Sequence, residues 1–384
     1  MTSVTDVPQA VTRIASEEDM DFGIGLLNYT GCWDDAVFAE QHGFSYAGFV
    51  DSPLNNGDPF AAMALTANAT SSMRLGTFIN VPSLRTAAAT AAGLSTVNQL
   101  APGRVFYGAG TGDTGRGTFG LPAMGVAGVR NYVKQVRALL IGQDVEHSHA
   151  GRENIVRMAN KDHIRVNIEN PIPVYIAADG PRALQATGEI ADGWIATLAK
   201  QGGNTMENAP AYFERSLRAV QEHAARAGRD FSQAYNIWTT SICILAPGES
   251  AISERALART GPMATFPFHA YACRPEIGDS LPQEVRDRLD IYERKVLERL
   301  PVPRDRLYQE VHAGHLSHLL EGEAEVLTED IVRMTTLTGT VEEIAGVLRR
   351  LEGIGLRNVC LWIPPASFRE VVLEVEANLM PLFR

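Results

Sequence analysis

The segment 172–194, IPVYIAADGPRALQATGEIADGW, constrains the fold of this chain more than any other segment. It begins with a short apolar run, passes through a tight turn and then shows helical spacing over 182–190. A second apolar run begins at Trp194. A strand, a turn, a helix and a strand in so short a stretch require two parallel strands joined by a helical crossover.

The turn in this segment, Ala178-Asp179-Gly180, falls where the first strand ends and the helix begins, and Pro181 takes a natural first helical position. Backbone N–H groups and the helix dipole at such an N-terminus favour an anion. We therefore predict that this turn binds the phosphate of a cofactor. An ordinary connection that needs glycine only for its backbone accounts for the same residues equally well.

Short apolar runs alternate with stretches of helical spacing along the whole chain. The expected strands are 22–27, 45–50, 74–80, 104–109, 172–177, 194–196, 235–245 and 358–363. The expected helices are 33–41, 60–70, 86–100, 126–141, 182–190, 211–227, 341–351 and 368–380. Eight strands, the last followed by a covering helix, predict an α/β fold of the (β/α)8 TIM-barrel class. An open doubly wound sheet is the alternative.

The alternation is interrupted between the seventh and eighth strands. Over about 247–330, prolines recur among helical pieces such as 286–300, and the segment is too long for a plain loop. We interpret it as an insertion or lid over the barrel mouth, within a single TIM-barrel domain at 21–384. Residues 1–20 are expected to form a loose arm, and 145–157 a hairpin around Gly151.

Composition excludes several classes of partner. The chain of 384 residues has a net charge of −11, which argues against nucleic-acid and anionic membrane surfaces. No apolar run is long enough to span a membrane, and the first residues lack the pattern of a secretion signal. The cysteines are scattered without a CxxC pair, as in a cytoplasmic protein with reduced thiols. They are Cys32, Cys243, Cys273 and Cys360.

One glycine-rich motif suggests a binding site by its spacing. Residues 110–115, GTGDTG, match GxGxxG, but the dinucleotide fingerprint requires a helix directly afterwards. The following RGTFGLP is not expected to be helical, so we reject a Rossmann site and keep a glycine-rich loop that a flat ligand can approach.

Three histidines, His312, His315 and His318, recur every third residue. A metal site would usually add a carboxylate or a cysteine to such a set, so we predict no metal. A solvated helix face is the favoured interpretation, with room for one histidine to point at the barrel mouth.

Polar residues at the ends of the second and third strands are further candidates. Asp51 can serve as a base or a substrate anchor, or it can cap a turn or pair with an arginine. Asn80 can bond a planar ring through its amide, or close a turn. Arg85 can hold an anion or lie at the surface; the family likeness described next favours a functional role.

Several segments together resemble the bacterial-luciferase-like flavin-dependent oxidoreductases, in particular the branch that includes methylenetetrahydromethanopterin reductase. The matching segments are 42–56, 74–113, 172–194 and 336–362, in the order and spacing of that family. Gly314-His315-Leu316 also resembles a recurring feature of the family. Where many relatives of this branch have Asp-His after the second strand, this chain has Asp51-Ser52.

The resemblance implies a barrel that binds a flavin-type ring at its carboxyl mouth. It also implies a non-proline cis peptide near 77–79, in the third strand. The residues that would contact the cofactor are Phe78, Ile79 and Asn80 behind the ring, Gly110 and Thr111 beside it, and Ala178, Asp179 and Gly180 at the phosphate.

The resemblance favours a flavin-dependent monooxygenase that uses reduced FMN and O2 on a small organic substrate. A separate NAD(P)H:flavin reductase would supply the reduced FMN, and an apolar lid with Phe266, Phe268 and Tyr271 would keep the site dry. His315 would act as acid or base, with Asp51 and Arg85 as substrate or proton-relay groups. The resemblance also implies a homodimer.

Two alternatives remain open. The first is hydride transfer with the 8-hydroxy-5-deazaflavin coenzyme F420, which cannot form a peroxide. The second is a flavin-binding protein without turnover.

Overall fold

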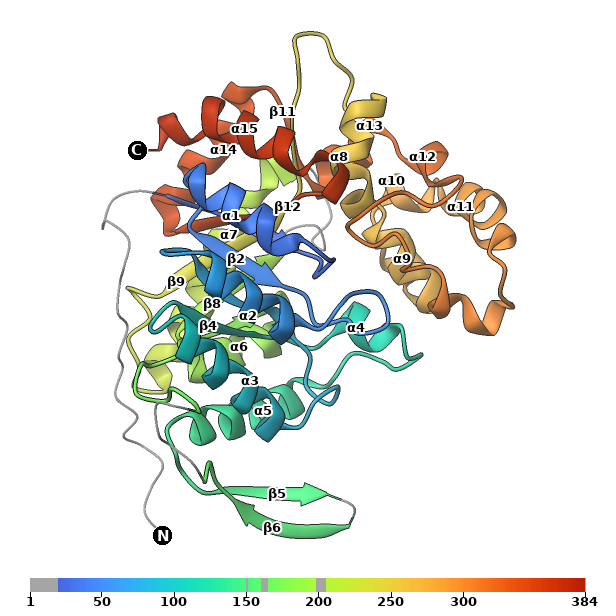
Figure 1. The fold of residues 1–384 in the computed structure, drawn as a ribbon. Coiled ribbons are helices and arrows are strands. Elements are labelled where there is room, and N and C mark those ends of the chain that lie inside the picture. The colour runs from blue at the N-terminus through green and yellow to red at the C-terminus, as the bar shows by residue number, and fades with distance from the viewer. Residues whose placement is uncertain (1–19, 150, 160–164, 198–204, 384) are drawn as a thin grey trace.

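Eight parallel strands close into a barrel in the computed structural model, which describes residues 20–149, 151–159, 165–197 and 205–383 (Figure 1). The TIM-barrel class predicted from the sequence is thereby confirmed. Around the barrel the order of strands is β1-β12-β9-β8-β7-β4-β3-β2. The strands are β1 (Asp21–Leu26), β2 (Tyr46–Phe49), β3 (Arg74–Asn80), β4 (Val105–Ala109), β7 (Val174–Ala177), β8 (Gly193–Thr197), β9 (Tyr235–Thr240) and β12 (Asn358–Trp362).

Helices surround the barrel and begin where the sequence supplies caps. The Asp58 carboxylate caps the N-terminus of α2, and a capping box between Thr340 and Glu343 starts α14. The surrounding helices are α1 (Cys32–Gln41), α2 (Pro59–Ala69), α3 (Ala87–Leu100), α5 (Val126–Leu140), α6 (Pro181–Ile190), α7 (Thr205–Arg226), α14 (Val341–Ile354) and α15 (Phe368–Asn378).

Aromatic rings fill the interior of the barrel, and glycines on neighbouring strands make room for them. The Tyr46 and Tyr235 rings stack with centroids 4.9 Å apart, and the Phe106 ring stacks on Tyr175 at 5.4 Å. A methyl group at Gly76 would lie only 2.3 Å from the ring of Phe106. The barrel interior is therefore a packed core, and we expect ligands to bind at its rim.

The insertion between β9 and β12 has a hydrophobic core of its own, which includes Phe268, Tyr292 and Ile331. A short parallel pair, β10 (Ile242–Ile244) and β11 (Leu337–Gly339), stands at its base. In Figure 1 the insertion forms the gold and orange lobe beside the barrel. Its helices are α8 (Glu254–Ala264), α9 (Phe266–Cys273), α10 (Gln283–Arg286), α11 (Leu289–Lys295), α12 (Glu323–Val326) and α13 (Glu329–Thr335).

Two predictions for this part of the chain are wrong in detail. The expected strand 235–245 is two strands, because the chain leaves the barrel after Thr240 and pairs with β11 instead. The expected helix 286–300 is broken into α10, α11 and a 3-10 turn at Leu297–Arg299. Both errors arise from tertiary pairing and packing that an apolar pattern does not encode.

An ion-pair cluster ties the insertion to the last helix of the barrel. The guanidinium of Arg259, on α8, is only 3% exposed. It lies 2.7 Å from Glu374 and 3.2 Å from Glu370, both on α15. Because the charge of Arg259 is buried, these carboxylates hold α8 in place against the barrel.

The smaller insertion is a hairpin, as predicted. β5 (Val145–His149) and β6 (Arg152–Val156) pair antiparallel, and Gly151 has φ 75°, a left-handed conformation that favours glycine. The predicted N-terminal arm lies almost wholly outside the described residues, which begin at Met20. Within the described ranges, no helix combines the length and apolar character needed to cross a membrane.

Replacing Gly76 by alanine tests the packing of the barrel interior. We expect the free energy of unfolding to fall by about 1–3 kcal/mol, because the added methyl overlaps the buried Phe106 ring. Urea unfolding followed by circular dichroism measures this change. The control is Gly346→Ala on α14, where a methyl meets nothing within 4 Å and a gain of about 0.5–1 kcal/mol is expected. Equal stability of the two variants would contradict a tightly packed interior.

Candidate functional site

The loops at the carboxyl ends of the strands bring together most of the residues singled out from the sequence. Asp51 follows β2, and its side chain is fully buried. Its Oδ2 accepts hydrogen bonds from Asn80 Nδ2 at 2.7 Å and from the Val81 amide at 3.2 Å. Asp51 therefore fixes the chain where it leaves β3.

Arg85 pairs with two carboxylates, which neutralise its charge. Its guanidinium lies 3.4 Å from Asp51 and 2.5 Å from Asp58. Burial raises the pKa of Asp51, although the charge of Arg85 acts in the opposite direction. Of the alternatives left open by the sequence, the pairing of Asp51 with an arginine is the one observed. Neither side chain lines the cavity described below.

The third strand contains a cis peptide bond between Phe78 and Ile79, within the segment where the family resemblance implied one. The pairing of β3 with β4 shifts register across these residues. The Asn80 side chain is fully buried. Both of its polar atoms have partners, since Nδ2 donates to Asp51 and Oδ1 accepts from the Tyr107 hydroxyl at 3.1 Å. A contact of Asn80 with a cofactor ring stays a prediction and would have to come from its main chain.

Ile79, Gly110 and Ala177 meet at one corner of the mouth. A methyl group at Gly110 would lie 2.1 Å from Ile79 Cδ1 and 3.3 Å from Ala177 Cβ. The carbonyl of Thr111 accepts a hydrogen bond from the Met124 amide. The expectation that no helix follows the glycines is wrong for Arg116 and Gly117, because a short helix, α4 (Asp113–Gly117), begins within the motif. Since β4 belongs to a closed barrel, this helix does not restore a Rossmann site.

The turn after β7 presents an open helix N-terminus. Gly180 precedes α6 without a side-chain cap, and a methyl group placed on it meets nothing within 4 Å. The turn itself is held firmly, since Trp194 Nε1 donates to the Ala178 carbonyl at 2.7 Å and the Tyr212 hydroxyl donates to the Asp179 carbonyl at 3.1 Å. Among the described residues, no atom therefore blocks the space beside Gly180 itself. Residues 198–204 lie outside the described ranges.

A cavity of about 1120 Å³ lies between the insertion and α4. His315 stands on its wall, where the imidazole stacks on Phe266 with centroids 4.5 Å apart. His315 Nε2 is 3.3 Å from the Thr114 hydroxyl. Other residues on the wall include Asp113, His269, Cys273, Arg274, Tyr308, His312 and Met334.

The interpretation of the three histidines as a solvated helix face is wrong. The segment 310–317 forms turns, with Leu316 at φ 61°, and only His318 is exposed. His312 is 6% exposed, and burial together with neighbouring His269 lowers its pKa to about 3. His312 is therefore neutral at physiological pH.

Two further corrections concern the insertion. Of the three aromatic residues expected at the mouth, Phe266 and Tyr271 line the cavity, whereas Phe268 packs on Tyr292 in the core of the insertion. Sequence reasoning missed His269, which is 2% exposed and bonded to Glu323 at 2.6 Å. No local spacing connects His269 with His312, so only the fold brings them together.

Comparison with known proteins identifies the family. The model of the luciferase-like monooxygenase family matches residues 28–358, and the chain belongs to this family. The resemblance inferred from the sequence is thereby confirmed.

Relatives by sequence carry two kinds of name. A 5,10-methylenetetrahydromethanopterin reductase of Methanolobus tindarius is 29% identical over 202 residues, which are 51% of this chain and 56% of the relative. An F420-dependent glucose-6-phosphate dehydrogenase of Rhodococcus erythropolis is 34% identical over 210 residues, 51% of this chain and 59% of the relative. The match therefore spans little more than half of either relative.

Solved structures share the fold at lower identity. The coenzyme F420 dependent tetrahydromethanopterin reductase from Methanopyrus kandleri has a TM-score of 0.66 at 20% identity, covering 95% of this chain and 100% of that chain. An FMN-bound oxygenating constituent of 3,6-diketocamphane monooxygenase from Pseudomonas putida has a TM-score of 0.58 at 12% identity, covering 94% and 98%. Proteins that use either cofactor thus share this architecture.

Replacing Asp51 by alanine tests its part in shaping the mouth. We expect the free energy of unfolding to fall by about 3 kcal/mol, because the buried donors of Asn80 and Val81 lose their acceptor. Chemical unfolding measures the change. Asp144→Ala is the control, since Asp144 forms an exposed ion pair with Arg157 and its loss should be barely measurable. A similarly small effect of Asp51→Ala would contradict the conclusion that Asp51 holds the chain in place at the end of β3.

Proposed function

We propose that this chain is an oxidoreductase that binds coenzyme F420, an 8-hydroxy-5-deazaflavin, at the carboxyl mouth of the barrel. The observation that carries the proposal is the open N-terminus of α6 at Gly180, on the rim that also holds the Ile79–Gly110–Ala177 corner. The 34% identity to an F420-dependent dehydrogenase supports the deazaflavin over FMN, the reverse of the order favoured by the sequence.

The residues at the rim fit such a cofactor. The Ala178 amide already donates to the Ile195 carbonyl at 3.1 Å, so the phosphate would be held at Gly180, where the uncapped N-terminus of α6 and its dipole favour an anion. Asp179 does not oppose this, because its Oδ1 is turned toward the Thr197 amide at 3.3 Å. Ile79 and the main chain of Asn80 would support the ring on one side, with Gly110 and Thr111 at its edge.

When bound, a 5-deazaflavin exchanges a hydride with a carbon of the substrate. The protein's part is to bind, orient and handle the proton that accompanies this exchange. His315 suits the proton role, because its imidazole lies on the cavity wall and Phe266 and Thr114 fix its orientation. Asp51 and Arg85 then act as positioning residues that hold the end of β3, and neither touches the substrate.

A second candidate is the FMN-dependent monooxygenase, and one observation favours it. Met263 and Leu316 of the insertion are buried against the barrel interior, in the same cluster as Phe78 and Trp362. An apolar closure of this kind excludes water, as oxygen chemistry on a reduced flavin requires. Reduced FMN would then come from a separate NAD(P)H:flavin reductase.

Cofactor titration tests the choice. We expect F420 to bind to the purified chain, which quenching of F420 fluorescence measures. We also expect bound F420 to be reduced when one compound from a panel of sugar phosphates and secondary alcohols is added. We expect no oxygen uptake with reduced FMN. Binding of reduced FMN with substrate-dependent oxygen uptake, and no binding of F420, would establish the second candidate instead. Binding without turnover of either kind would favour a carrier role.

A pair of variants at Gly180 tests the phosphate site. Gly180→Asp and Gly180→Asn add side chains of the same shape, both are good N-caps, and nothing lies within 4 Å to obstruct them. Only the aspartate adds a negative charge at the proposed phosphate position. We expect the aspartate variant to bind F420 at least about tenfold more weakly than the asparagine variant. Equal dissociation constants, with equal thermal stability, would place the phosphate elsewhere.

A further inference from the structure

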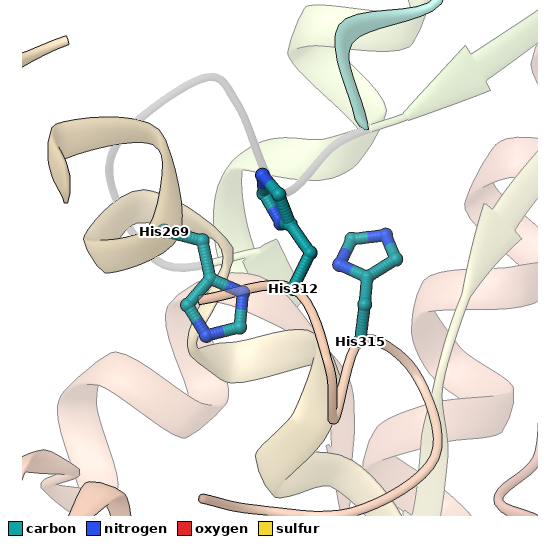
Figure 2. Close-up of side chains that lie close together, drawn as sticks. All are labelled: His269, His312 and His315. Atoms are coloured by element: carbon teal, nitrogen blue, oxygen red, sulfur yellow. The ribbon is translucent and has the colours of Figure 1, made fainter. Parts of the chain in front are cut away.

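Three imidazoles from separate parts of the insertion converge on the cavity wall (Figure 2). His269 comes from α9, and His312 and His315 come from the turns that precede α12. One ligand atom of each lies within 4.8 Å of those of the other two. The His269 and His312 side chains are almost completely buried, at 2% and 6% exposure.

Two nitrogens of this cluster are buried without a hydrogen bond. Among the described residues, Nδ1 of His269 and Nδ1 of His312 have no partner. A buried polar atom without a partner is costly, and native proteins rarely contain one without a reason. Both atoms are therefore available to bind a further group.

Glu323 determines which nitrogen of His269 is available. Its carboxylate is 1% exposed and lies 2.6 Å from His269 Nε2. A carboxylate that accepts the Nε2 proton leaves the lone pair on Nδ1. This carboxylate–histidine arrangement is the one that orients histidine ligands toward metal ions. The negative charge of Glu323 would also compensate the positive charge of a metal ion buried at this place.

We propose that His269, His312 and His315 bind a divalent transition-metal ion, for which Zn²⁺ is the best-suited probe. Imidazole nitrogens at about 2.0–2.1 Å, in a set of three with a fourth position left open, are typical of zinc sites. In a tetrahedral site such nitrogens are about 3.3 Å apart, so metal binding would have to draw the three rings closer together than their present spacing of up to 4.8 Å. The open position faces the cavity, where an oxygen or nitrogen of a ligand can complete the coordination.

A buried ion pair between protonated His269 and Glu323 is the competing explanation. It accounts for the 2.6 Å contact equally well. However, protonation would place an N–H on Nδ1, and among the described residues no acceptor reaches that atom. The neutral tautomer with Nδ1 as a ligand avoids this cost, as well as a positive charge beside His312.

None of residues 178–180 lines this cavity, and the test of the metal site does not depend on the identity of the cofactor. A bound ion would compete with the proton role proposed for His315. The test therefore measures metal binding and not turnover.

Isothermal titration of the full chain with Zn²⁺, after treatment with a chelator, tests the proposal. We expect one ion per chain, and a rise in melting temperature of about 3 °C at a hundred times the dissociation constant. His269→Gln and His312→Gln should each weaken binding about 100-fold or more, and Glu323→Gln about 10–100-fold. His318→Gln, on the same segment but exposed, is the matched control and should bind like the wild type.

Two outcomes would overturn the proposal: no stoichiometric binding by the wild type, or the same affinity in His269→Gln as in His318→Gln. If the His269 and His312 variants fail to fold, the visible spectrum of the wild type with Co²⁺ decides. Intense d–d bands of a four- or five-coordinate ion support the site, and the weak spectrum of hexaaqua Co²⁺ contradicts it.

Discussion

The packing of aromatic rings against strand glycines is the constraint on which the rest of this structure depends. Phe106 can fill the barrel only because Gly76 beside it has no side chain. Since buried rings from several strands pack together in the interior, we expect binding groups at the rim. The long segment between β9 and β12 is placed to cover that rim, and its own hydrophobic core lets it keep a defined shape beside the barrel.

Burial of charge gives Asp51, a candidate catalytic residue, a structural role at the end of β3. Asp51 ends a barrel strand, which is a usual place for a catalytic acid. Its fully buried carboxylate instead joins Asn80, the Val81 amide and Arg85 into one network at the end of β3. His315 differs, because its ring lies on the cavity wall with Phe266 behind it. Of the three candidate catalytic residues, His315 is the one that lines this cavity.

Local pattern was a good guide wherever one element could bury its own apolar face. The helix over 182–190 and the hairpin around Gly151 appear within a residue or two of their expected bounds. Pattern failed at 235–245, where a continuous apolar run divides between two sheets, and at 312–318, where histidine spacing of three occurs in turns. In both places the decisive contacts come from residues distant in the sequence.

The sequence by itself determined the barrel class, the glycine turn at 178–180 and the family, because periodicity, turn chemistry and short motifs are local properties of the chain. Tertiary structure alone decided that Asp51 is buried beside Arg85, and that His269 meets His312 and His315. The burial of a side chain, and which side chains meet, depend on how distant segments of the chain pack together. The same residue type can therefore bind a ligand, support the backbone or lie at the surface, according to its neighbours. For that reason the burial and the partners of the rim residues follow from the tertiary structure and not from the sequence.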